Sequence, residues 1–451
     1  MKRIYLYVAL FLEMTFAGNA QERCWTMEEC MRYAVDNSPA VKRQVYTADT
    51  YRAEYISSVA SFFPSLETRT TAQYNYGRAI DPETNTYVNT TTFNNYYEGY
   101  TSIPVFNGGQ LINQWRLAKS NRQMGMNDVQ KEKDDLALNV LVAYVDVAYY
   151  QGTVRFAAEK QEESNRILYK TKREEELGVK GRADVAQIEA QAAGDEYNLT
   201  RQQNLLNTAL LKLKELMNFP YDRVLAIDTT ALVTDYFFGD ESSGDIFSSA
   251  RENNPAVLQA GFQLQASRLN LLIQKGKLFP SISFSAGINT SYFKNLKSET
   301  SPVAFRDQFR NNRGEYINFN IRFPLFDGLT RITDVRRARN NVRIAQEQQT
   351  EVVRQLQTAI EQSILDRRGY ARESIQMEKK LKSDELAYQV TLRKFEEGIM
   401  SPIDLQTSAN TLIESKANLL QRKLMYLLKC KEVDYYKGKP LIIDNSPTVN
   451  H

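Results

Sequence analysis

The sequence has 451 residues, with 57 lysines and arginines against 54 aspartates and glutamates, which leaves a formal net charge of +3. This near-neutral balance gives no electrostatic basis for nucleic-acid binding, which usually requires a basic surplus or a basic stripe. The sequence contains one histidine, His451. The composition therefore argues against histidine-activated nucleophiles, histidine general bases and histidine-rich metal sites, and so against an enzyme.

Residues 1–20 have the form of a secretory signal peptide. Two basic residues precede a short apolar run from Ile4 to Leu12, and small residues then lead to Gly18-Asn19-Ala20, which resembles a signal-peptidase site. The alternative is an N-terminal core helix. The apolar run is too short to cross a bilayer, and we expect no lipid anchor at Cys24, because the residues before it are charged or polar.

The sequence repeats itself in two halves. Landmarks of the first half recur in the same order in the second half, at offsets of 216 and then 220 residues. This register indicates a tandem duplication, with repeats over 21–235 and 236–440 and a tail over 441–451. The matching pairs are Asn37-Ser38-Pro39 with Asn253-Asn254-Pro255, Phe63-Pro64-Ser65 with Phe279-Pro280-Ser281, Pro104-Val105-Phe106 with Pro324-Leu325-Phe326, Gly178 with Gly398, and Asp184 with Asp404.

Each repeat predicts the same series of elements. A helical pattern runs from Thr26 to Phe62 and begins with a Thr-x-x-Glu capping box. A strand pair is expected over about 65–104, and a long helical pattern without proline then reaches Leu177. A glycine turn leads to a last helix over about 183–218. The second repeat has a helix over about 245–278, a strand pair over about 281–324 and a long helix over about 329–397. A turn then leads to a last helix over about 403–433.

The long helices predict how each repeat packs. At 1.5 Å per residue such a helix is roughly 100 Å long, and the two shorter helices of a repeat have about the same length when stacked end to end. We therefore expect two short helices to lie head to tail against one long antiparallel helix. Apolar residues at seven-residue spacing indicate coiled-coil contacts: Leu405, Leu412, Leu419 and Tyr426, and in the first repeat Val185, Ala192, Leu199 and Leu206.

The segments between the prolines and the long helices alternate in polarity like strands. The clearest alternation runs from Tyr316 to Phe323, where Ile317, Phe319 and Ile321 share one face. An apolar face opposite a polar face, with aromatic residues near the ends, is typical of a barrel wall between lipid and water. A half-buried sheet of a soluble protein gives the same alternation.

The strand number sets a condition on the barrel interpretation. A chain that supplies four strands cannot close a transmembrane barrel alone, because such barrels need about eight strands or more. Open sheet edges cannot face lipid. Membrane insertion would therefore require several copies of the chain to share one barrel, as a dimer or a trimer, and strand counting does not choose between these.

The duplicated order of elements and its landmarks resemble the TolC-type outer-membrane efflux channel family over essentially the whole mature chain. The resemblance implies a homotrimer with a mainly α fold and a small β part. A transmembrane β-barrel completed only in the trimer would continue into a long antiparallel α-helical barrel in the periplasm. The implied function is a passive exit duct in the outer membrane of a Gram-negative cell, for efflux of small molecules or for type I secretion. The implied partners are outer-membrane lipid, a periplasmic adaptor protein and an inner-membrane efflux pump or ABC transporter, and no cofactor is implied.

The family closes its periplasmic end at the helical turns, and the resemblance carries these gate positions onto the sequence. Asp184 and Asp404 match the gate aspartates that follow the turn glycines Gly178 and Gly398. A further gate aspartate of the family is replaced here by Thr407.

The latch of the best-known family member is absent from this sequence. Phe395, Met400 and Ala183 stand where that member has the tyrosine, arginine and threonine of the latch. Lys180 and Arg182 are candidate replacement cations for the two gate aspartates, although charges at an exposed turn are usually only solvated.

A simpler role is open to both aspartates. Ser401-Pro402-Ile403-Asp404 has the form of an N-cap, a proline at the first helical position and an acid at the third, and Asp184 has the same place after Gly181. A carboxylate there accepts hydrogen bonds from exposed amides and favours the helix macrodipole. The two roles are compatible, because three copies of Asp404 near a threefold axis would repel one another and attract cations.

Cys30 and Cys430 each fall on an apolar helical face. They are predicted either to form a disulfide bridge or to stay as buried thiols.

Two other classes of function compete with the channel. An exported coiled-coil structural protein without pore activity would explain the seven-residue spacing but not the duplicated amphipathic strands. An exported hydrolase would need a nucleophile with a base, or a carboxylate pair in a cleft. The sequence has no phosphate-binding glycine loop and no Cys-x-x-Cys, so we expect no enzyme.

Overall fold

The computed structural model describes residues 24–81, 85–229, 236, 242–297 and 303–442. The predicted signal peptide lies outside the described residues, as do residue 235 and most of the predicted tail. Contacts divide the chain into two compact units, each of which draws on both predicted repeats. Unit 1 is Met1–Val45, Asn127–Leu258 and Val352–His451, and unit 2 is Tyr46–Met126 and Gln259–Glu351.

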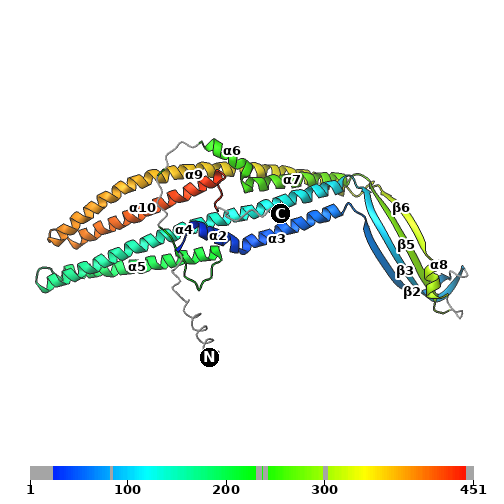
Figure 1. The fold of residues 1–451 in the computed structure, drawn as a ribbon, viewed down its shortest axis with the longest axis horizontal. Helices are drawn as coiled ribbons and strands as arrows, with labels where there is room; N and C mark the ends of the chain where they lie inside the picture. Colours follow the sequence, from blue (N-terminus) through cyan, green and yellow to red (C-terminus); the bar gives the residue numbers. More distant parts are fainter. Residues whose placement is uncertain (1–23, 82–84, 230–235, 237–241, 298–302, 443–451) are drawn as a thin grey trace, which may run out of the picture. The chain divides into compact units, whose positions relative to one another are not determined.

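The elements follow the duplicated order that the sequence predicts, and the fold is mainly helical with a small β part (Figure 1). The two long helices, α4 and α9, have 67 residues each and begin 220 positions apart. The first repeat holds α2 Met27–Asn37, α3 Pro39–Ala60, β2 Ser65–Asp81, β3 Thr86–Phe106, α4 Gln110–Glu176 and α5 Arg182–Met217. The second holds α6 Ser243–Asn253, α7 Pro255–Gly276, β5 Ser281–Asn295, β6 Gly314–Arg322, α9 Thr330–Glu396 and α10 Pro402–Tyr436.

The prediction of one continuous helix before each strand pair is wrong. The helix is broken at Ser38, before Pro39, and at Asn254, before Pro255, where the backbone is extended with ψ of 125° and 123°. A proline ring clashes with a helical conformation of the residue before it. The side chains of Ser38 and Asn254 each accept a hydrogen bond from the backbone N–H two residues later, at 3.2 and 3.0 Å, so a new capped helix begins at each break.

The strands of unit 2 form one antiparallel sheet in the order β2-β3-β5-β6. Strand β3 of the first repeat pairs with β5 of the second, with Tyr97 opposite Thr290, so the sheet joins the two repeats. Strands β2 and β6 are its edges. The sequence did not predict α8, Phe305–Asn311, which contacts β5 where the Gln308 side chain bonds the backbone N–H and C=O of Phe293, both at 2.9 Å.

The predicted pairing of each long helix with shorter helices is confirmed within the units. In unit 2, Gly125 of α4 faces Ala48 and Tyr51 of α3. In unit 1, polar contacts described below join α4 to α5 and α9 to α10. A side chain at Gly125 would come within 2.7 Å of the Tyr51 ring, so glycine permits this close approach of the two helices.

The largest buried cluster of unit 1 gathers α2, α4, α5 and α10. Two short strands cover it, β1 Cys24–Trp25 and β4 Ala226–Ile227, which pair in parallel. Tyr144 is 1% exposed in this cluster, and its hydroxyl reaches the carbonyl oxygens of Trp25, at 3.2 Å, and Asp228. Burial of the ring with a satisfied hydroxyl fastens α4 to both short strands.

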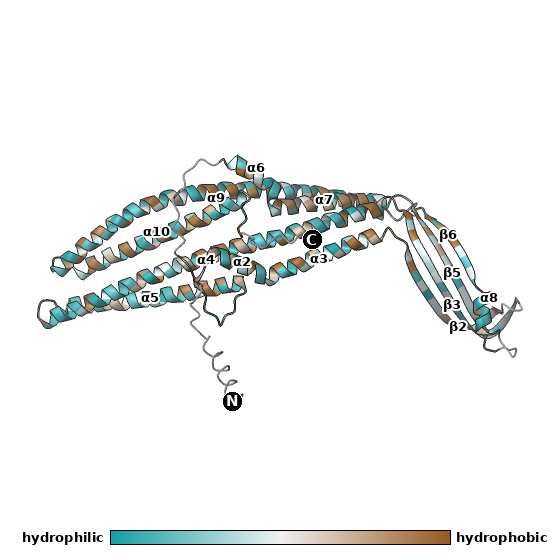
Figure 2. Cartoon of the chain, viewed as in Figure 1, coloured by the Kyte–Doolittle hydropathy of each residue, from teal (hydrophilic) through white to brown (hydrophobic). Residues whose placement is uncertain are grey.

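Polar and apolar residues are interspersed along the long helices (Figure 2). Among the described residues, the structure contains no helix with both the length and the hydropathy that a membrane span requires.

Candidate functional site

The gate positions predicted from the sequence gather at the ends of two helical hairpins in unit 1. One hairpin joins α4 to α5 through residues 177–181, and the other joins α9 to α10 through residues 397–401. Figure 1 shows the two turns at the same end of their hairpins.

Each turn is built on a glycine in the left-handed region. Gly178 has φ of 75° and Gly398 has φ of 76°, a conformation that costs a residue with a Cβ roughly 1–2 kcal/mol. In both turns the residue after the glycine donates its N–H to the carbonyl five residues earlier, at 2.8 Å. This is the Schellman arrangement, which satisfies carbonyls that the helix end leaves open. The two glycines are therefore required by the turns themselves.

Asp404 caps the start of α10, as the sequence predicts. Its Oδ2 accepts hydrogen bonds from the Ser401 hydroxyl, at 2.7 Å, and from the Ser401 backbone N–H, at 3.2 Å. The Ser401 hydroxyl in turn accepts the backbone N–H of Asp404 at 3.3 Å. Two hydrogen bonds from Ser401, the stronger from its hydroxyl and the weaker from its backbone N–H, hold the pKa of Asp404 below its usual value. The carboxylate is exposed, so capping leaves it accessible to ions.

Asp184 holds the equivalent place in the first hairpin, where the backbone N–H of Gly181 donates to its Oδ2 at 3.3 Å. Because glycine has no side chain, the reciprocal bond of the second hairpin is missing here. Thr407 donates its hydroxyl to the Ile403 carbonyl at 2.8 Å, within its own helix. Arg182 is the exposed first residue of α5.

In the structure, Lys180 contacts an aromatic ring and not one of the two gate aspartates considered in the sequence analysis. Its Nζ lies 4.8 Å from the ring centroid of Phe395. Within the described part of the two turns, neither Lys180 nor Arg182 forms an ion pair with Asp184 or Asp404. The Phe395 ring thus contacts a cation from the other hairpin, and the ring quadrupole attracts that cation.

Phe395 is itself buried, with 5% of its surface exposed. It belongs to an apolar cluster that draws residues from both hairpins, and Met400 packs against that cluster. The two positions at which the resemblance implies the polar groups of a latch therefore form an apolar contact here. The other buried members of the cluster are Ile188, Tyr388, Leu405, Ala409 and Leu412.

Two polar contacts between the hairpins were missed by sequence reasoning. Lys170 Nζ of α4 lies 3.2 Å from Glu396 Oε1 of α9. Tyr388 of α9 is hydrogen-bonded to Glu163 of α4. The pKa of Tyr388 is raised, mainly by burial of its hydroxyl and secondly by this carboxylate. Contacts between different long helices leave no spacing signal in the sequence, because only residues three or four apart on one helix are neighbours by rule.

A buried polar triad joins α4 to α5 farther from the turn. Lys160 Nζ lies 2.9 Å from Asp195 Oδ1, and the Ser164 hydroxyl donates to Asp195 Oδ2 at 2.6 Å. The Lys160 and Asp195 side chains are only 10% and 9% exposed. Lys160 also donates to Asn410 of α10, which ties the triad to the second hairpin.

The second hairpin carries a triad at the same three positions, 220 residues later, with serine and aspartate exchanged. Lys380 Nζ lies 2.7 Å from Asp384 Oδ2, and the Ser415 hydroxyl donates to Asp384 at 2.5 Å. Hydrogen bonds from Lys380 and, to a smaller extent, from Ser415 lower the pKa of Asp384. Here the Lys380 side chain is 50% exposed, so this copy is the more solvated one.

The three cysteines, all within the described residues, form no disulfide bridge with one another. Of the two alternatives for Cys30 and Cys430, the structure therefore shows thiols and not a bridge, but Cys430 is only partly buried, unlike the buried thiol that the sequence predicts there. Cys30 is fully buried, and burial together with the neighbouring Glu29 carboxylate raises the pKa of its thiol to about 12. Such a thiol is unreactive near neutral pH.

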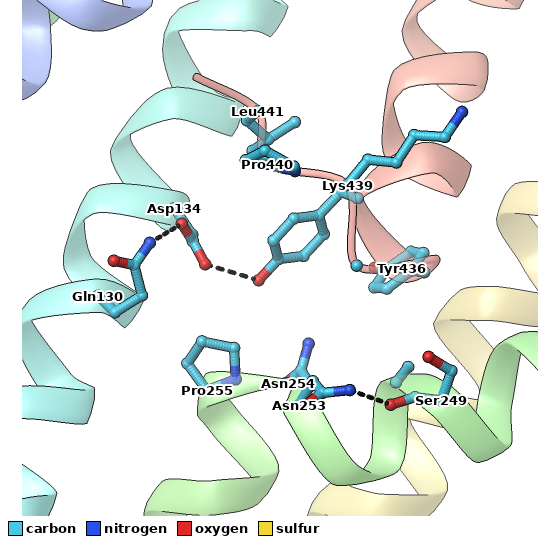
Figure 3. A pocket seen from close by; sticks show the side chains of 13 residues that line it. Gln130, Asp134, Ser249, Asn253, Asn254, Pro255, Tyr436, Lys439, Pro440 and Leu441 are labelled. Atoms are coloured by element: carbon cyan, nitrogen blue, oxygen red, sulfur yellow. Dashed lines mark hydrogen bonds between the residues drawn. The ribbon is translucent and has the colours of Figure 1, made fainter. Parts of the chain in front are cut away.

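A cavity of about 240 Å³ lies beside Asp134 of α4 (Figure 3). The Asp134 carboxylate accepts hydrogen bonds from the Gln130 amide at 2.7 Å and the Tyr435 hydroxyl at 3.3 Å, and burial raises its pKa. The rest of the lining includes the break between α6 and α7 and the segment after α10. No cluster of three or more potential metal ligands occurs in the described part of the chain.

The model of the family described as outer membrane efflux protein matches residues 31–218 and 246–430. The outer membrane protein TolC of Vibrio cholerae is 23% identical over 306 residues, which cover 65% of this chain and 65% of the relative. TolC of Escherichia coli is 22% identical over 328 residues, 70% of this chain and 64% of the relative. The chain thus spans less than two thirds of the length of these relatives.

Solved structures share the fold. The CmeC outer membrane channel of Campylobacter jejuni aligns with a TM-score of 0.80 at 14% identity, covering 91% of this chain and 85% of that one. The outer membrane protein VceC of Vibrio cholerae aligns with a TM-score of 0.77 at 14% identity, covering 91% and 96%.

Proposed function

The chain belongs to the outer membrane efflux protein family, and on this basis we propose that it is a passive exit duct for small molecules, or for a type I secretion substrate, across the outer membrane. The observation that carries the proposal is the match of both repeats to the family model. The family is one of channels, not of enzymes, and its relatives are outer membrane proteins.

A homotrimer with a shared barrel is the assembly that we propose. Each chain offers one sheet of four strands whose edges, β2 and β6, have no further neighbouring strand among the described residues. Three copies would supply twelve strands, above the minimum of about eight for a transmembrane barrel. On β6 the apolar residues Ile317, Phe319 and Ile321 are 72%, 66% and 65% exposed, which suits a surface that faces hydrocarbon.

The hairpin turns are the proposed gate. The exposed Asp404 carboxylate at the start of α10 would repeat around the axis of a trimer and attract cations there. The contact of Lys180 with Phe395 would hold the first turn of one copy to the end of α9 in the second hairpin, in place of the latch that this chain lacks.

The proposed partners are a periplasmic adaptor protein and an inner-membrane pump or ABC transporter. They follow from family membership, because a passive duct has no energy source of its own and cargo must be delivered to it.

Two measurements on the mature protein test the function. The protein is extracted from outer membranes with detergent, its native mass is determined, and its conductance is recorded in a planar bilayer. We expect the mass of three chains and a stable ion conductance. A single-chain mass without conductance would instead support an exported coiled-coil protein.

A further inference from the structure

Besides the α4–α9 contacts described above, the two hairpins of one chain meet along α4 and α10. Glu159 Oε2 of α4 lies 3.6 Å from Lys416 Nζ of α10. Asp134 of α4, labelled in Figure 3, accepts the Tyr435 hydroxyl of α10 through its Oδ2 at 3.3 Å. Gly152 of α4 lies so close to Leu420 that an added Cβ would be 2.1 Å from a leucine methyl carbon. This α4–α10 junction is therefore tightly packed as well as polar at its margins.

The duplication provides a second pair of faces with the same geometry. Helix α9 is the counterpart of α4 and helix α5 is the counterpart of α10, with starts at 110 and 330 and at 182 and 402. Because no insertion falls inside these helices, every α4 or α5 position has its counterpart 220 residues later. Of the ion pairs that join the two hairpins in the described part of the single chain, none links α9 to α5.

The counterparts of the two polar contacts are pairs of opposite charge. Glu159 and Lys416 correspond to Lys379 and Glu196, so the pair is kept with its charges reversed. Asp134 and Tyr435 correspond to Arg354 and Glu215. All four counterparts are exposed in the single chain, with the cations on α9 and the anions on α5.

One polar contact is not repeated, and the apolar part of the junction changes character. Lys160 and Asn410 correspond to Lys380 and Ala190, which cannot form a side-chain hydrogen bond with each other. Leu420, Leu424 and Leu428, which pack α10 into the apolar cluster containing α4, correspond to Thr200, Asn204 and Thr208 of α5. The second junction therefore depends more on charge and less on apolar burial.

A ring of duplicated chains brings these faces together. When copies join head to tail, the second repeat of one copy meets the first repeat of the next, and a closed ring requires this junction to have nearly the same rotation as the one inside the chain. We propose that α9 of one copy binds α5 of a second copy through Lys379 with Glu196 and Arg354 with Glu215. The inference rests on the proposed trimer.

The polar character of this junction has a measurable consequence. Ion pairs between exposed side chains are weakened by salt, because ionic strength screens them. The α4–α10 junction inside the chain is held by the buried Leu424 and Leu428 and the partly buried Leu420, and salt does not weaken apolar packing. The helical part of the assembly is therefore expected to loosen between copies before it loosens within a copy.

Site-directed cross-linking tests the contact. Cysteines replace Lys379 and Glu196 in one chain in which Cys24 and Cys430 are changed to serine, and a short bismaleimide is applied to the protein from outer membranes. We expect covalent dimers and trimers on a denaturing gel. The matched control places cysteines at Glu159 and Lys416, the counterpart pair, and is expected to cross-link within a single chain.

Charge reversal tests the pairing itself. The readout is the salt dependence of trimer dissociation, measured on protein without the introduced cysteines. Because Glu196 is exposed, we expect Glu196→Lys to leave folding of the single chain unchanged. Glu196→Lys should lower the salt concentration at which trimers dissociate, with the equilibrium shifted about two- to fivefold per pair, and Lys379→Glu in the same chain should restore it.

The outcomes separate this inference from the proposed function. A native mass of three chains, with cross-links at positions 379 and 196 found only inside single chains or not at all, overturns the inference and leaves the duct intact. A single-chain native mass overturns both. The cross-links could form while Glu196→Lys combined with Lys379→Glu fails to restore the trimer. In that case α9 and α5 of neighbouring copies are close together, but the proposed charge pairing is wrong.

Discussion

The ammonium group of Lys180 lies 4.8 Å from the ring centroid of Phe395, so the turn of one hairpin contacts the last residues of the long helix in the other. A lysine over an aromatic face contributes about 0.5–1 kcal/mol at an exposed site. Phe395 is anchored below by the apolar cluster, which fixes the ring that the cation meets. The turn is thus held by a contact that needs no hydroxyl and no arginine.

This contact predicts an effect on opening. Phe395→Leu keeps an apolar side chain in the cluster but removes the aromatic face, so the first turn should separate more often from the second hairpin. We expect larger or more frequent conductance steps in a planar bilayer, and the same change for Lys180→Gln. Arg182→Gln is the matched control, because Arg182 is a cation of the same turn without the ring contact. Equal conductance in all three variants would leave the contact with a structural role only.

Asp404 is predicted to govern cation preference. Asp404→Asn keeps most of the shape of the cap and removes the charge, so the trimer should form while block by multivalent cations weakens. Asp184→Asn is the comparison in the first hairpin. Unchanged selectivity and block for Asp404→Asn would remove this residue from the gate.

The pH dependence of Asp404 has a definite sign. Its pKa is lowered in the folded chain, mainly by the Ser401 hydroxyl. The contribution of the carboxylate to the start of α10 is therefore present above the ordinary aspartate pKa and is lost as pH falls through the lowered value. Multivalent block that persists at pH 5 and disappears only in stronger acid would agree with a cap that stays ionised. Repulsion among the Asp404 carboxylates of different copies would raise their pKa. Block by multivalent cations that already weakens near neutral pH would mean that this repulsion outweighs the cap.

The two polar triads predict unequal losses of stability. Asp195→Ala leaves the buried Lys160 without its carboxylate, and breaking a buried pair from one side costs about 3–5 kcal/mol. The counterpart change Asp384→Ala opens a more exposed pair, worth about 1 kcal/mol or less. Thermal unfolding of the mature protein in detergent should show a much larger decrease in Tm for Asp195→Ala. Equal decreases would contradict the difference in burial.

The Asp384 triad also has a predicted pH range. Lys380 and Ser415 lower the pKa of Asp384. Its stabilising effect is therefore fully present above the ordinary aspartate pKa and is lost as pH falls from there through the lowered value. The difference in Tm between the wild type and Asp384→Ala should accordingly shrink on acidification.

The cysteines should differ in reactivity. Cys24 is exposed, whereas the buried Cys30 has a pKa raised to about 12, so a maleimide at pH 8 should label Cys24 and leave Cys30 unmodified until the protein unfolds. Mass spectrometry after labelling in denaturant, with and without reductant, should find the same number of modified thiols. Fewer modified thiols without reductant would reveal a bridge between Cys30 and Cys430.

Much of the fold was predictable because its signals are local. Gly178 and Gly398 mark turns since a left-handed residue is needed there, and the Ser401 to Asp404 cap acts within four residues. The breaks before Pro39 and Pro255 were also encoded locally, but the surrounding helical pattern concealed them. Helix α8 lay in a segment without clear periodicity, and its position depends on the contact of Gln308 with β5.

The sequence by itself determined the duplication, the order of the elements, the two capped turns and the alternating strands, because each depends on residues close together in the chain. Only the tertiary structure decided that Lys180 meets Phe395 and that Lys160 and Asp195 are buried together. It also decided that the β strands of the two repeats share one sheet. Such contacts join distant parts of the chain, and their energies depend on how helices and strands lie side by side, which no local spacing specifies.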